Sequence, residues 1–453
     1  MDFKYVGLDI LTQAASTWRY SFLFFYLNWL IIRKFYLNLY SVINKMMEKR
    51  KGIITIIGIY TIVQLIILLG FGYTPYPDSQ GYVTCAKQAL SYNQFYPAKE
   101  TLYTLPFLWN IGAINMVAFS LKLFHSITPI LITYTLLKGC TLYLVYLITH
   151  RCFGAKIANI TCLIYLLYPA NYGEGTSLLS EVPFIFFCMA GIYASIKGNC
   201  LMGGLLMGCA DYFRPIAIIF IFAFILCQIR NYKGYLKLCL GYVLVINSIG
   251  YCNYCCKGEY IYKAKTGWMA LAQYHWDNDG EHKGTKPMAL TDNHHLTFSQ
   301  KDEMWRNMFV DWLKDHKKEY IKQIPVKIGK TYISDNVNMC AFLDQTEKEK
   351  DYMYNSLSIN SMLNSFPIYS LAQWITFYNL ICYYGIMITF LLSLKHIRKL
   401  RLSWLIVLIG TTFIALFGHG EARFHIPYMP FIIMCSAYYI CNFKKHKNTE
   451  QSI

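Results

Sequence analysis

The chain has 453 residues, of which 55% are hydrophobic and only 15% are charged. Soluble domains carry about 25% charged residues, so this composition argues against a soluble protein. The 39 Tyr, 29 Phe and 9 Trp residues exclude an intrinsically disordered chain. The formal net charge is +17, but residues 253–366 contain 15 acidic and 15 basic residues. No basic face on a soluble domain is indicated, and we expect no nucleic-acid partner.

Apolar residues occur in blocks of roughly 20, about the length at which a helix crosses the ~30 Å core of a bilayer. The blocks are continuously apolar rather than alternating, which excludes a porin-type barrel. The pattern predicts an all-α polytopic membrane protein with about ten transmembrane helices. In chain order these are 53–72, 126–149, 156–170, 178–196, 199–211, 213–229, 235–252, 367–393, 402–418 and 424–442.

The N-terminal segment 1–52 is predicted to be a cytoplasmic or interfacial extension. Its apolar core, Tyr20–Ile32, is about 13 residues long, short for a span, and is flanked by Arg19, Arg33 and Lys34. It lacks the small-residue cleavage site of a signal peptide. An interfacial helix is the preferred interpretation, and a crossing by residues 20–43 stays open.

The orientation follows from the basic residues in the short connections between spans. One side carries 17 Lys and Arg residues, and the three short connections on the other side carry only Arg214 and Arg423. Basic loops stay cytoplasmic, so both termini are predicted inside and both long loops outside. This parity requires that 107–124 lie at the interface without crossing. The predicted parts are a transmembrane module 53–252 with a first outer loop 73–125, an outer loop domain 253–366, C-terminal helices 367–442 and a tail 443–453.

Charged residues gather at the predicted outer ends of the spans. They are Asp78, Glu174, Glu181, Asp211, Arg214, Glu421 and Arg423. Charges at a membrane are costly and need a reason, and no charged residue is assigned to the middle of a span. A polar site at the outer surface, covered by the 253–366 loop, is one reason. Structural roles stay open: Asp78 could cap a helix over 79–90, and Arg214 and Arg423 could be snorkelling anchors.

Five sets of short motifs follow one another in order over about 49–440. They are Asp78-Ser79-Gln80-Gly81-Tyr82 with a predicted interfacial helix Pro106–Phe124; Leu166-Leu167-Tyr168-Pro169 with Leu179-Ser180-Glu181-Val182-Pro183-Phe184; Asp211-Tyr212-Phe213-Arg214-Pro215; Thr266-Gly267-Trp268-Met269 with Trp312–Lys330; and Glu421-Ala422-Arg423-Phe424-His425-Ile426-Pro427. Together they resemble the GT-C membrane glycosyltransferases. The closest resemblance is to bacterial relatives of the dolichyl-phosphate-mannose protein mannosyltransferases and of the lipid A aminoarabinose transferases.

The resemblance implies a polyprenyl-phosphate sugar donor and a glycan, lipid or protein acceptor, at the outer face of a bacterial cytoplasmic membrane. Asp78 is the expected general base, with Glu181 and Glu174 as second choices, because a carboxylate can take the acceptor's hydroxyl proton. Fixed cations should stabilise the leaving phosphate. The expected substrate-binding residues are Arg214 and Arg423, with Lys87 and Lys330 behind them, and Tyr82 and Glu421.

The chain also departs from the family pattern. Relatives often carry two adjacent acidic residues in the first loop, whereas Ser79 follows Asp78 here, so a divalent metal ion stays an open question. The cluster Cys252, Cys255 and Cys256 lacks a matching second pair of metal ligands. Two other functions remain open: a transporter or flippase of lipid-linked glycans, and a non-catalytic membrane subunit of a cell-envelope assembly complex. A transporter would want polar residues at mid-membrane and paired broken helices.

Overall fold

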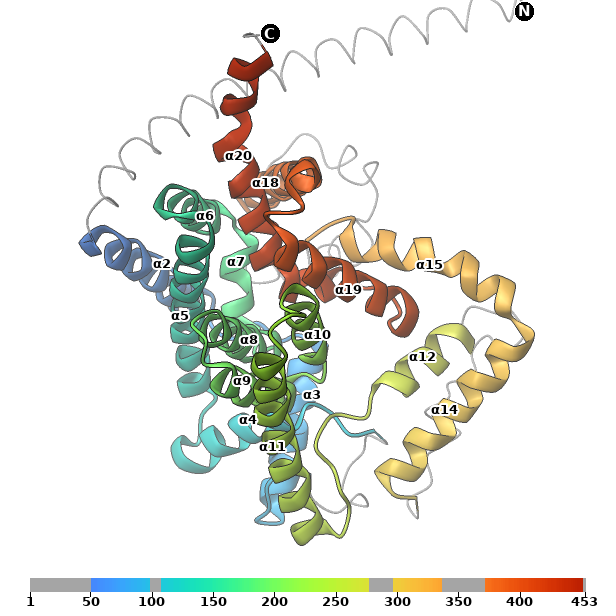
Figure 1. The fold of residues 1–453 in the computed structure, drawn as a ribbon. Helices are drawn as coiled ribbons and strands as arrows, with labels where there is room; N and C mark the ends of the chain where they lie inside the picture. Colours follow the sequence, from blue (N-terminus) through green and yellow to red (C-terminus); the bar gives the residue numbers. More distant parts are fainter. Residues whose placement is uncertain (1–49, 98–106, 277–295, 336–370, 451–453) are drawn as a thin grey trace, which may run out of the picture. The chain divides into compact units, whose positions relative to one another are not determined.

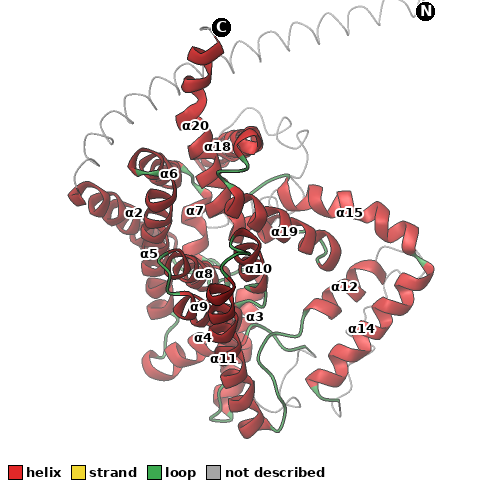
Figure 2. Cartoon of the chain, in the orientation of Figure 1, coloured by secondary structure: helices red, strands yellow, loops and turns green. Residues whose placement is uncertain are grey.

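The computed structural model of the chain describes residues 50–97, 107–276, 296–335 and 371–450. The chain divides into two compact units, 1–55 and 56–453. Apart from the first residues of helix α2, the features discussed below belong to the second unit. Its described residues are helical and contain no strand, apart from one isolated bridge between Leu108 and Lys265 (Figures 1 and 2). The predicted all-α class is confirmed. The predicted interfacial helix around Tyr20–Ile32 lies outside the described residues.

The first half of the described chain is a series of apolar helices joined by short connections. They are α2 (Arg50–Phe71), α3 (Pro77–Ser91), α4 (Ile111–Phe124), α5 (Thr128–Phe153), α6 (Ala155–Leu167), α7 (Ala170–Gly173), η2 (Glu174–Thr176), α8 (Glu181–Ile196), α9 (Cys200–Phe213), α10 (Ile218–Cys227) and α11 (Tyr232–Lys257). The second half contains α12 (Gly267–Trp276), α14 (Phe298–Asp315), α15 (Lys317–Tyr332), α18 (Leu371–Leu392), η4 (Ser393–His396), α19 (Arg401–Phe417), η5 (Ala422–Tyr428) and α20 (Met429–Glu450).

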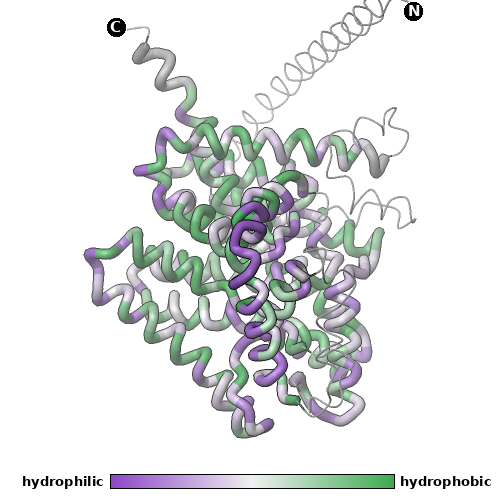
Figure 3. The backbone as a smooth tube through the Cα atoms, turned by 90° about the vertical axis from the view of Figure 1, so that its right-hand side faces the viewer, coloured by the Kyte–Doolittle hydropathy of each residue, from purple (hydrophilic) through white to green (hydrophobic). Residues whose placement is uncertain are grey.

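Several helices in the described part of the chain are long and apolar enough to cross a membrane, and their hydrophobic stretches are visible in Figure 3. They are Gly52–Phe71, Thr128–Phe153, Tyr232–Lys257, Trp374–His396 and Ala422–Phe443. A sixth crossing results if the bent pair Ala170–Thr176 and Glu181–Ile196 counts as one span. The helices of a multi-pass membrane protein are therefore present. The predicted count of ten is not confirmed, because α6, α9, α10 and α19 are shorter; a 13-residue helix such as α6 is only about 20 Å long.

The connection between α6 and α8, one of the three short connections predicted on the outer side, is buried. The segment Ala170–Thr176 is bent by 116° from α8, and every residue from Tyr168 to Ile185 is buried. Since buried backbone groups need internal partners in an apolar environment, this segment must be held by neighbouring side chains. We call residues 170–180 the buried connection.

Two helices approach each other at backbone distance. A Cβ added at Gly204 of α9 would lie 1.9 Å from the carbonyl oxygen of Leu238 in α11, and one at Gly241 would lie 2.3 Å from that of Leu201. Small residues allow this kind of close helix packing, which is common between membrane helices. The α9–α11 interface is thus a contact of backbone on backbone.

The helices α12, α14 and α15 pack around a separate aromatic core (yellow to orange in Figure 1). Trp305, Phe309 and Trp312 of α14 form its centre, with Met269 and Leu271 of α12. Helix α14 begins with a capping box, in which Thr297 and Gln300 bond reciprocally to each other's backbone. Two hydrogen bonds tie α15 to α19: Tyr320 Oη to the Leu416 carbonyl at 2.5 Å, and Tyr332 Oη with Thr411 Oγ1 at 2.7 Å.

Candidate active site

Asp78 lies in the first turn of α3, which begins at Pro77. The hydroxyl of Ser79 accepts a hydrogen bond from the Tyr76 amide at 2.9 Å and donates to the Tyr76 carbonyl at 2.8 Å. Ser79 therefore closes the first turn. The alternative role of Asp78 as the helix cap is wrong, because the cap is made by Tyr76 and Ser79. The Asp78 carboxylate, with 25% of its side chain exposed, points elsewhere.

Arg423, in η5, joins two carboxylates. Its Nη1 donates to Asp78 Oδ2 at 2.7 Å, and its Nε lies 3.1 Å from Glu421 Oε2. The guanidinium carbon also lies 5.2 Å from the centre of the Tyr76 ring. Arg423 thus contacts a carboxylate 345 positions earlier in the chain and shares its charge between two carboxylates. The prediction that the first loop and the start of the last helix meet is realised in this contact.

Glu421 has further partners. Tyr76 Oη donates to its Oε1 at 2.9 Å, and His419 Nε2 lies 3.4 Å from its Oε2. Burial alone would raise the pKa of Glu421, but Arg423, His419 and the Tyr76 hydroxyl outweigh it and lower this pKa to about 2. Glu421 is therefore a fixed negative charge at neutral pH and holds no proton to give.

A second ion pair lies beside the first. Arg214, at the end of α9, pairs with Glu181 at the start of α8, and the Glu181 side chain is only 1% exposed. Both guanidinium groups contact the same aromatic ring: the carbons of Arg214 and Arg423 lie 5.6 and 5.9 Å from the centre of Phe424. Each cation–π contact is attractive, so the two contacts offset part of the repulsion between the two positive charges. We call Asp78, Glu181, Arg214, Glu421 and Arg423 the charged cluster.

Tyr82 connects to the same region through a polar chain. Asn110 Nδ2 donates to Tyr82 Oη at 2.8 Å and to Ser180 Oγ at 3.0 Å, and Ser180 Oγ lies 3.3 Å from Glu181 Oε2. Tyr82 is buried, and its hydroxyl is connected to Glu181 through the hydrogen bonds of Asn110 and Ser180.

The segment η5 is anchored by His425, which is fully buried. Its Nδ1 bonds with the Thr331 carbonyl at 2.7 Å, and its Nε2 lies 3.4 Å from Asp335 Oδ1. Tyr168, at the end of α6, donates to the other oxygen of Asp335. Three parts of the chain therefore fix the backbone that carries Glu421 and Arg423.

Three predicted site residues lie apart from the charged cluster. Lys87 is exposed on α3, nine positions after Asp78, or about 13 Å along the helix axis. Lys330 is exposed on α15, with its ammonium 5.4 Å from the centre of the Tyr274 ring. Glu174, a second choice for the base, forms an ion pair with Lys138, with 2.6 Å between Lys138 Nζ and Glu174 Oε2.

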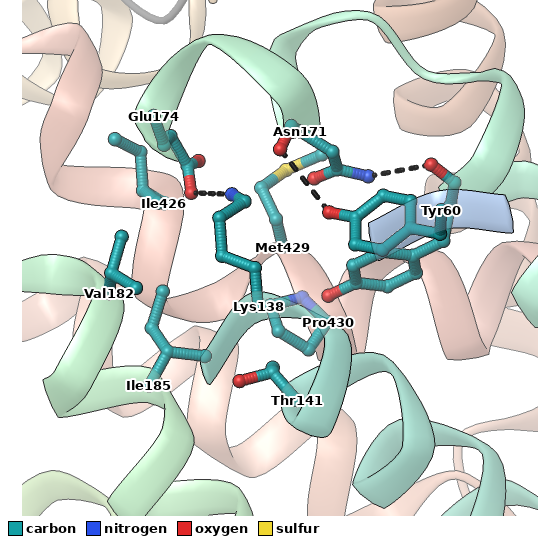
Figure 4. A pocket seen from close by; sticks show the side chains of 11 residues that line it. Tyr60, Lys138, Thr141, Asn171, Glu174, Val182, Ile185, Ile426, Met429 and Pro430 are labelled. Carbon is teal, nitrogen blue, oxygen red and sulfur yellow. Dashed lines mark hydrogen bonds and ion pairs between the residues drawn. The ribbon is translucent and has the colours of Figure 1, made fainter. Parts of the chain in front are cut away.

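Lys138 corrects the prediction that no charged residue lies within a span. It is the eleventh residue of the 26-residue helix α5, and its side chain is 8% exposed. The ion pair with Glu174 lines a cavity of about 30 Å³, together with Tyr60 and Asn171 (Figure 4). Lys138 can be read in the sequence of the predicted span 126–149. It was not singled out there, because this span remains strongly hydrophobic with one lysine in it.

A second buried cation was also missed, in the helical layer over α12 and α15. Lys327 and His275 are fully buried, with Lys327 Nζ 3.3 Å from His275 Nε2. The ammonium also faces the rings of Tyr320 and Tyr274, at 4.9 and 5.5 Å from their centres. Burial lowers the pKa of Lys327 to about 8, and burial together with Lys327 lowers the pKa of His275 to about 3. The pair therefore carries one positive charge, on the lysine.

The lowered pKa of His275 predicts that the folded protein loses stability in acid. Between pH 6.5 and about 3 the unfolded chain binds more protons at this position than the folded protein, so the free energy of unfolding falls as the pH falls through this window. We expect His275→Gln to lose less thermal stability than the wild type between pH 7 and pH 5. The exposed His150→Gln is the matched control and should behave as wild type. An equal loss in wild type and His275→Gln would contradict the assignment.

Gly420, which precedes Glu421 of the charged cluster, packs against the backbone of Lys327 in α15. Its φ is +74°, and an added Cβ would lie 2.7 Å from both Cα and the carbonyl oxygen of Lys327. Gly72 has a similar φ of +68° but nothing within 4 Å of an added Cβ. We expect Gly72→Ala to cost about 1–2 kcal/mol from backbone strain alone. Gly420→Ala should lower the unfolding temperature further, because α15 must also shift; an equal loss in the two variants would show that the close approach is unimportant.

In the part of the chain that the structure describes, no group of three or more His, Cys, Asp or Glu side chains gathers as metal ligands. Two carboxylates of the charged cluster, Asp78 and Glu421, are both bound to Arg423. A divalent metal ion at this site stays a prediction.

No family model matches the chain, and a comparison with curated proteins finds none that matches.

Proposed function

We propose that the protein is an integral membrane glycosyltransferase that moves a sugar from a polyprenyl-phosphate donor to a hydroxyl of an acceptor. The observation that carries this proposal is the charged cluster itself. Five side chains spread over positions 78 to 423 form two ion-paired groups that share the Phe424 ring, and three of the five are carboxylates paired with two arginines. These are the residue types that the transfer needs, and the resemblance to GT-C enzymes suggested them.

Asp78 is the proposed general base. A positioned carboxylate that accepts the acceptor's hydroxyl proton contributes about 10²–10⁴-fold to the rate. Of the three carboxylates, Glu181 is enclosed and Glu421 is held strongly anionic, whereas Asp78 is a quarter exposed and has one ion-pair partner. A single displacement with an oxocarbenium-like transition state would invert the anomeric carbon.

The arginines are proposed to bind the leaving phosphate. Their planar fork matches phosphate oxygens, and charge that gathers on the leaving group is stabilised by fixed donors. Both arginines are paired with carboxylates in this arrangement. A donor phosphate therefore competes with Asp78 for Arg423, and the carboxylate freed by this exchange is the group that takes the acceptor's proton. The base becomes available when the donor arrives.

The proposal includes the finer membrane arrangement expected from the sequence. With about ten crossings and cytoplasmic basic loops, the charged cluster would face the outside of a bacterial cytoplasmic membrane, at headgroup level. The layer of α12, α14 and α15 then covers the cluster from outside. A donor with its lipid chain in the bilayer would present its phosphate at this depth.

A transporter or flippase of lipid-linked glycans is the second candidate. Two features typical of transporters are present: the ion pair between Lys138, within a long apolar helix, and Glu174, and the 116° bend next to α8. The enzyme is favoured because the charged cluster lies apart from this pair and combines carboxylates with arginines.

The test uses the purified full-length protein in lipid nanodiscs with a panel of polyprenyl-phosphate sugars. Consumption of one donor, with release of polyprenyl phosphate and gain of one sugar by an added acceptor extract, supports the transferase. In proteoliposomes, movement of a labelled lipid-linked glycan between leaflets without consumption identifies the transporter. If neither occurs, the role as a non-catalytic subunit is favoured and both proposals fail.

A further inference from the structure

We propose that Lys138 and Glu174 are a positioning pair: the ion pair fixes the buried connection 170–180 and thereby sets the place of Glu181 in the charged cluster. This inference rests on the proposed function and assigns Glu174 a role other than that of a base. It concerns two of the buried ionisable groups that the proposed transfer does not use.

The buried connection has a conformation that needs support. It turns through 116° before α8, and Leu178 has a φ of +54°, three residues before Glu181. A left-handed conformation costs an L-residue other than glycine about 1–2 kcal/mol. The surrounding contacts must hold it, because an unsupported connection would relax and move the start of α8.

Side chains of α2 hold the first part of the buried connection. Gln64 Nε2 donates to the Asn171 carbonyl at 2.8 Å, and Tyr60 Oη donates to the same oxygen at 3.2 Å. An added Cβ at Gly175 would lie 2.7 Å from Gln64 Oε1, so the segment packs tightly against this helix. The Thr74 amide also donates to the Thr176 carbonyl at 3.1 Å.

The Lys138–Glu174 pair holds the centre of the connection from α5. Its two side chains are 8% and 10% exposed, so the attraction is poorly screened by solvent. Replacing a buried ion pair by two apolar side chains is often neutral, whereas removing one partner is strongly destabilising. A pair of this kind therefore adds little to the free energy of unfolding. Its Nζ–Oε2 contact instead fixes the position of Glu174 relative to α5.

The cavity in Figure 4 links the pair to the charged cluster. Its wall includes Glu174 and Lys138 together with Val182 and Ile426. Val182 follows Glu181 directly, and Ile426 lies three residues after Arg423. A cavity of about 30 Å³ has room for a water molecule, so the polar pair faces a small, adjustable space. Glu174 and Val182, the neighbour of Glu181, line the same space, so a shift of Glu174 would change the packing at the start of α8.

The first experiment measures donor turnover and KM for four variants. The single variants Glu174→Gln and Lys138→Met should lose about tenfold to a hundredfold in turnover, with donor KM changed less than about twofold, because misplacing a contact by ~1 Å costs up to ~10²-fold. The double variants Lys138→Met/Glu174→Met and Lys138→Glu/Glu174→Lys should recover most of the turnover. If both doubles stay as impaired as Glu174→Gln, or if the single variants match the wild type, the inference is overturned.

The second experiment needs no transferase activity. Thermal unfolding is compared for Glu174→Gln, Glu181→Gln and the double variant. Positions coupled through one segment have non-additive effects on stability, whereas distant independent positions add. We expect the melting-temperature losses of Glu174→Gln and Glu181→Gln not to add, while those of Glu174→Gln and the exposed Asp311→Asn do add. Additive losses in both pairs would refute the positioning role, even if the transferase proposal were correct. Absence of any transfer by the wild type would refute only the proposed function.

Discussion

Asp78→Asn is expected to reduce sugar transfer by about 10²–10⁴-fold, the usual contribution of a general base. Asn has the shape of Asp, and its side-chain oxygen can still accept the hydrogen bond that Arg423 Nη1 donates at 2.7 Å. It cannot take up the acceptor's proton. Helix α3 should also form normally, because the cap is made by Tyr76 and Ser79. The loss should therefore fall on turnover and leave the unfolding temperature nearly unchanged.

The control for Asp78 is Thr84→Ala, an exposed position on the same helix whose hydroxyl bonds only to the Gln80 carbonyl, at 2.9 Å. Both variants are compared with wild type for turnover of the donor identified in the panel. A folded Asp78→Asn protein that transfers sugar at the wild-type rate would remove Asp78 as the base.

Arg214→Met is expected to destabilise the folded protein by about 3–5 kcal/mol, because Glu181 would become a buried charge without a counter-ion. Arg214→Met combined with Glu181→Leu should recover much of this loss, since neither charge then remains. Thermal unfolding in detergent measures the effect. The exposed Arg398→Met is the matched control and should change stability by no more than about 0.5 kcal/mol.

The same position separates structure from binding. Arg214→Lys keeps the positive charge beside Glu181 but loses the planar fork that matches phosphate. We expect it to fold with near-normal stability and to bind the donor more weakly. A stability of Arg214→Met equal to that of wild type would contradict the buried ion pair, and wild-type donor affinity in Arg214→Lys would count against the phosphate role.

The apolar runs predicted most of the helices, because burial in an apolar surrounding follows directly from composition. Their ends were less predictable. The predicted span 213–229 begins instead at Ile218: Arg214 is extended before Pro215, as residues before proline usually are, and Asp211 Oδ1 accepts the Ala217 amide at 2.8 Å. These local hydrogen bonds compete with the helix, and a hydrophobicity pattern does not contain them.

The charged cluster was predictable as a group but not as a set of contacts. The topology predicted from the basic loops puts Asp78, Arg214 and Arg423 on one side of the membrane, which is why the sequence could group them. The choice of partners depends on how α3, α8 and η5 pack, and no spacing rule gives a contact across 345 positions. Lys327 was missed for a related reason: a lysine in a polar loop looks solvated until the aromatic rings around it are known.

For the proposed donor, the close contact between α9 and α11 would restrict the path by which a long isoprenoid tail reaches the charged cluster. At Gly204 and Gly241, in the seam between these two helices, the added Cβ positions lie against the facing main chain, so no side chain at these two positions could rotate aside. Lateral access for the proposed donor would then lie outside this seam. Substitutions that widen the seam would loosen the hairpin without opening a portal, so screens for altered lipid length should look elsewhere.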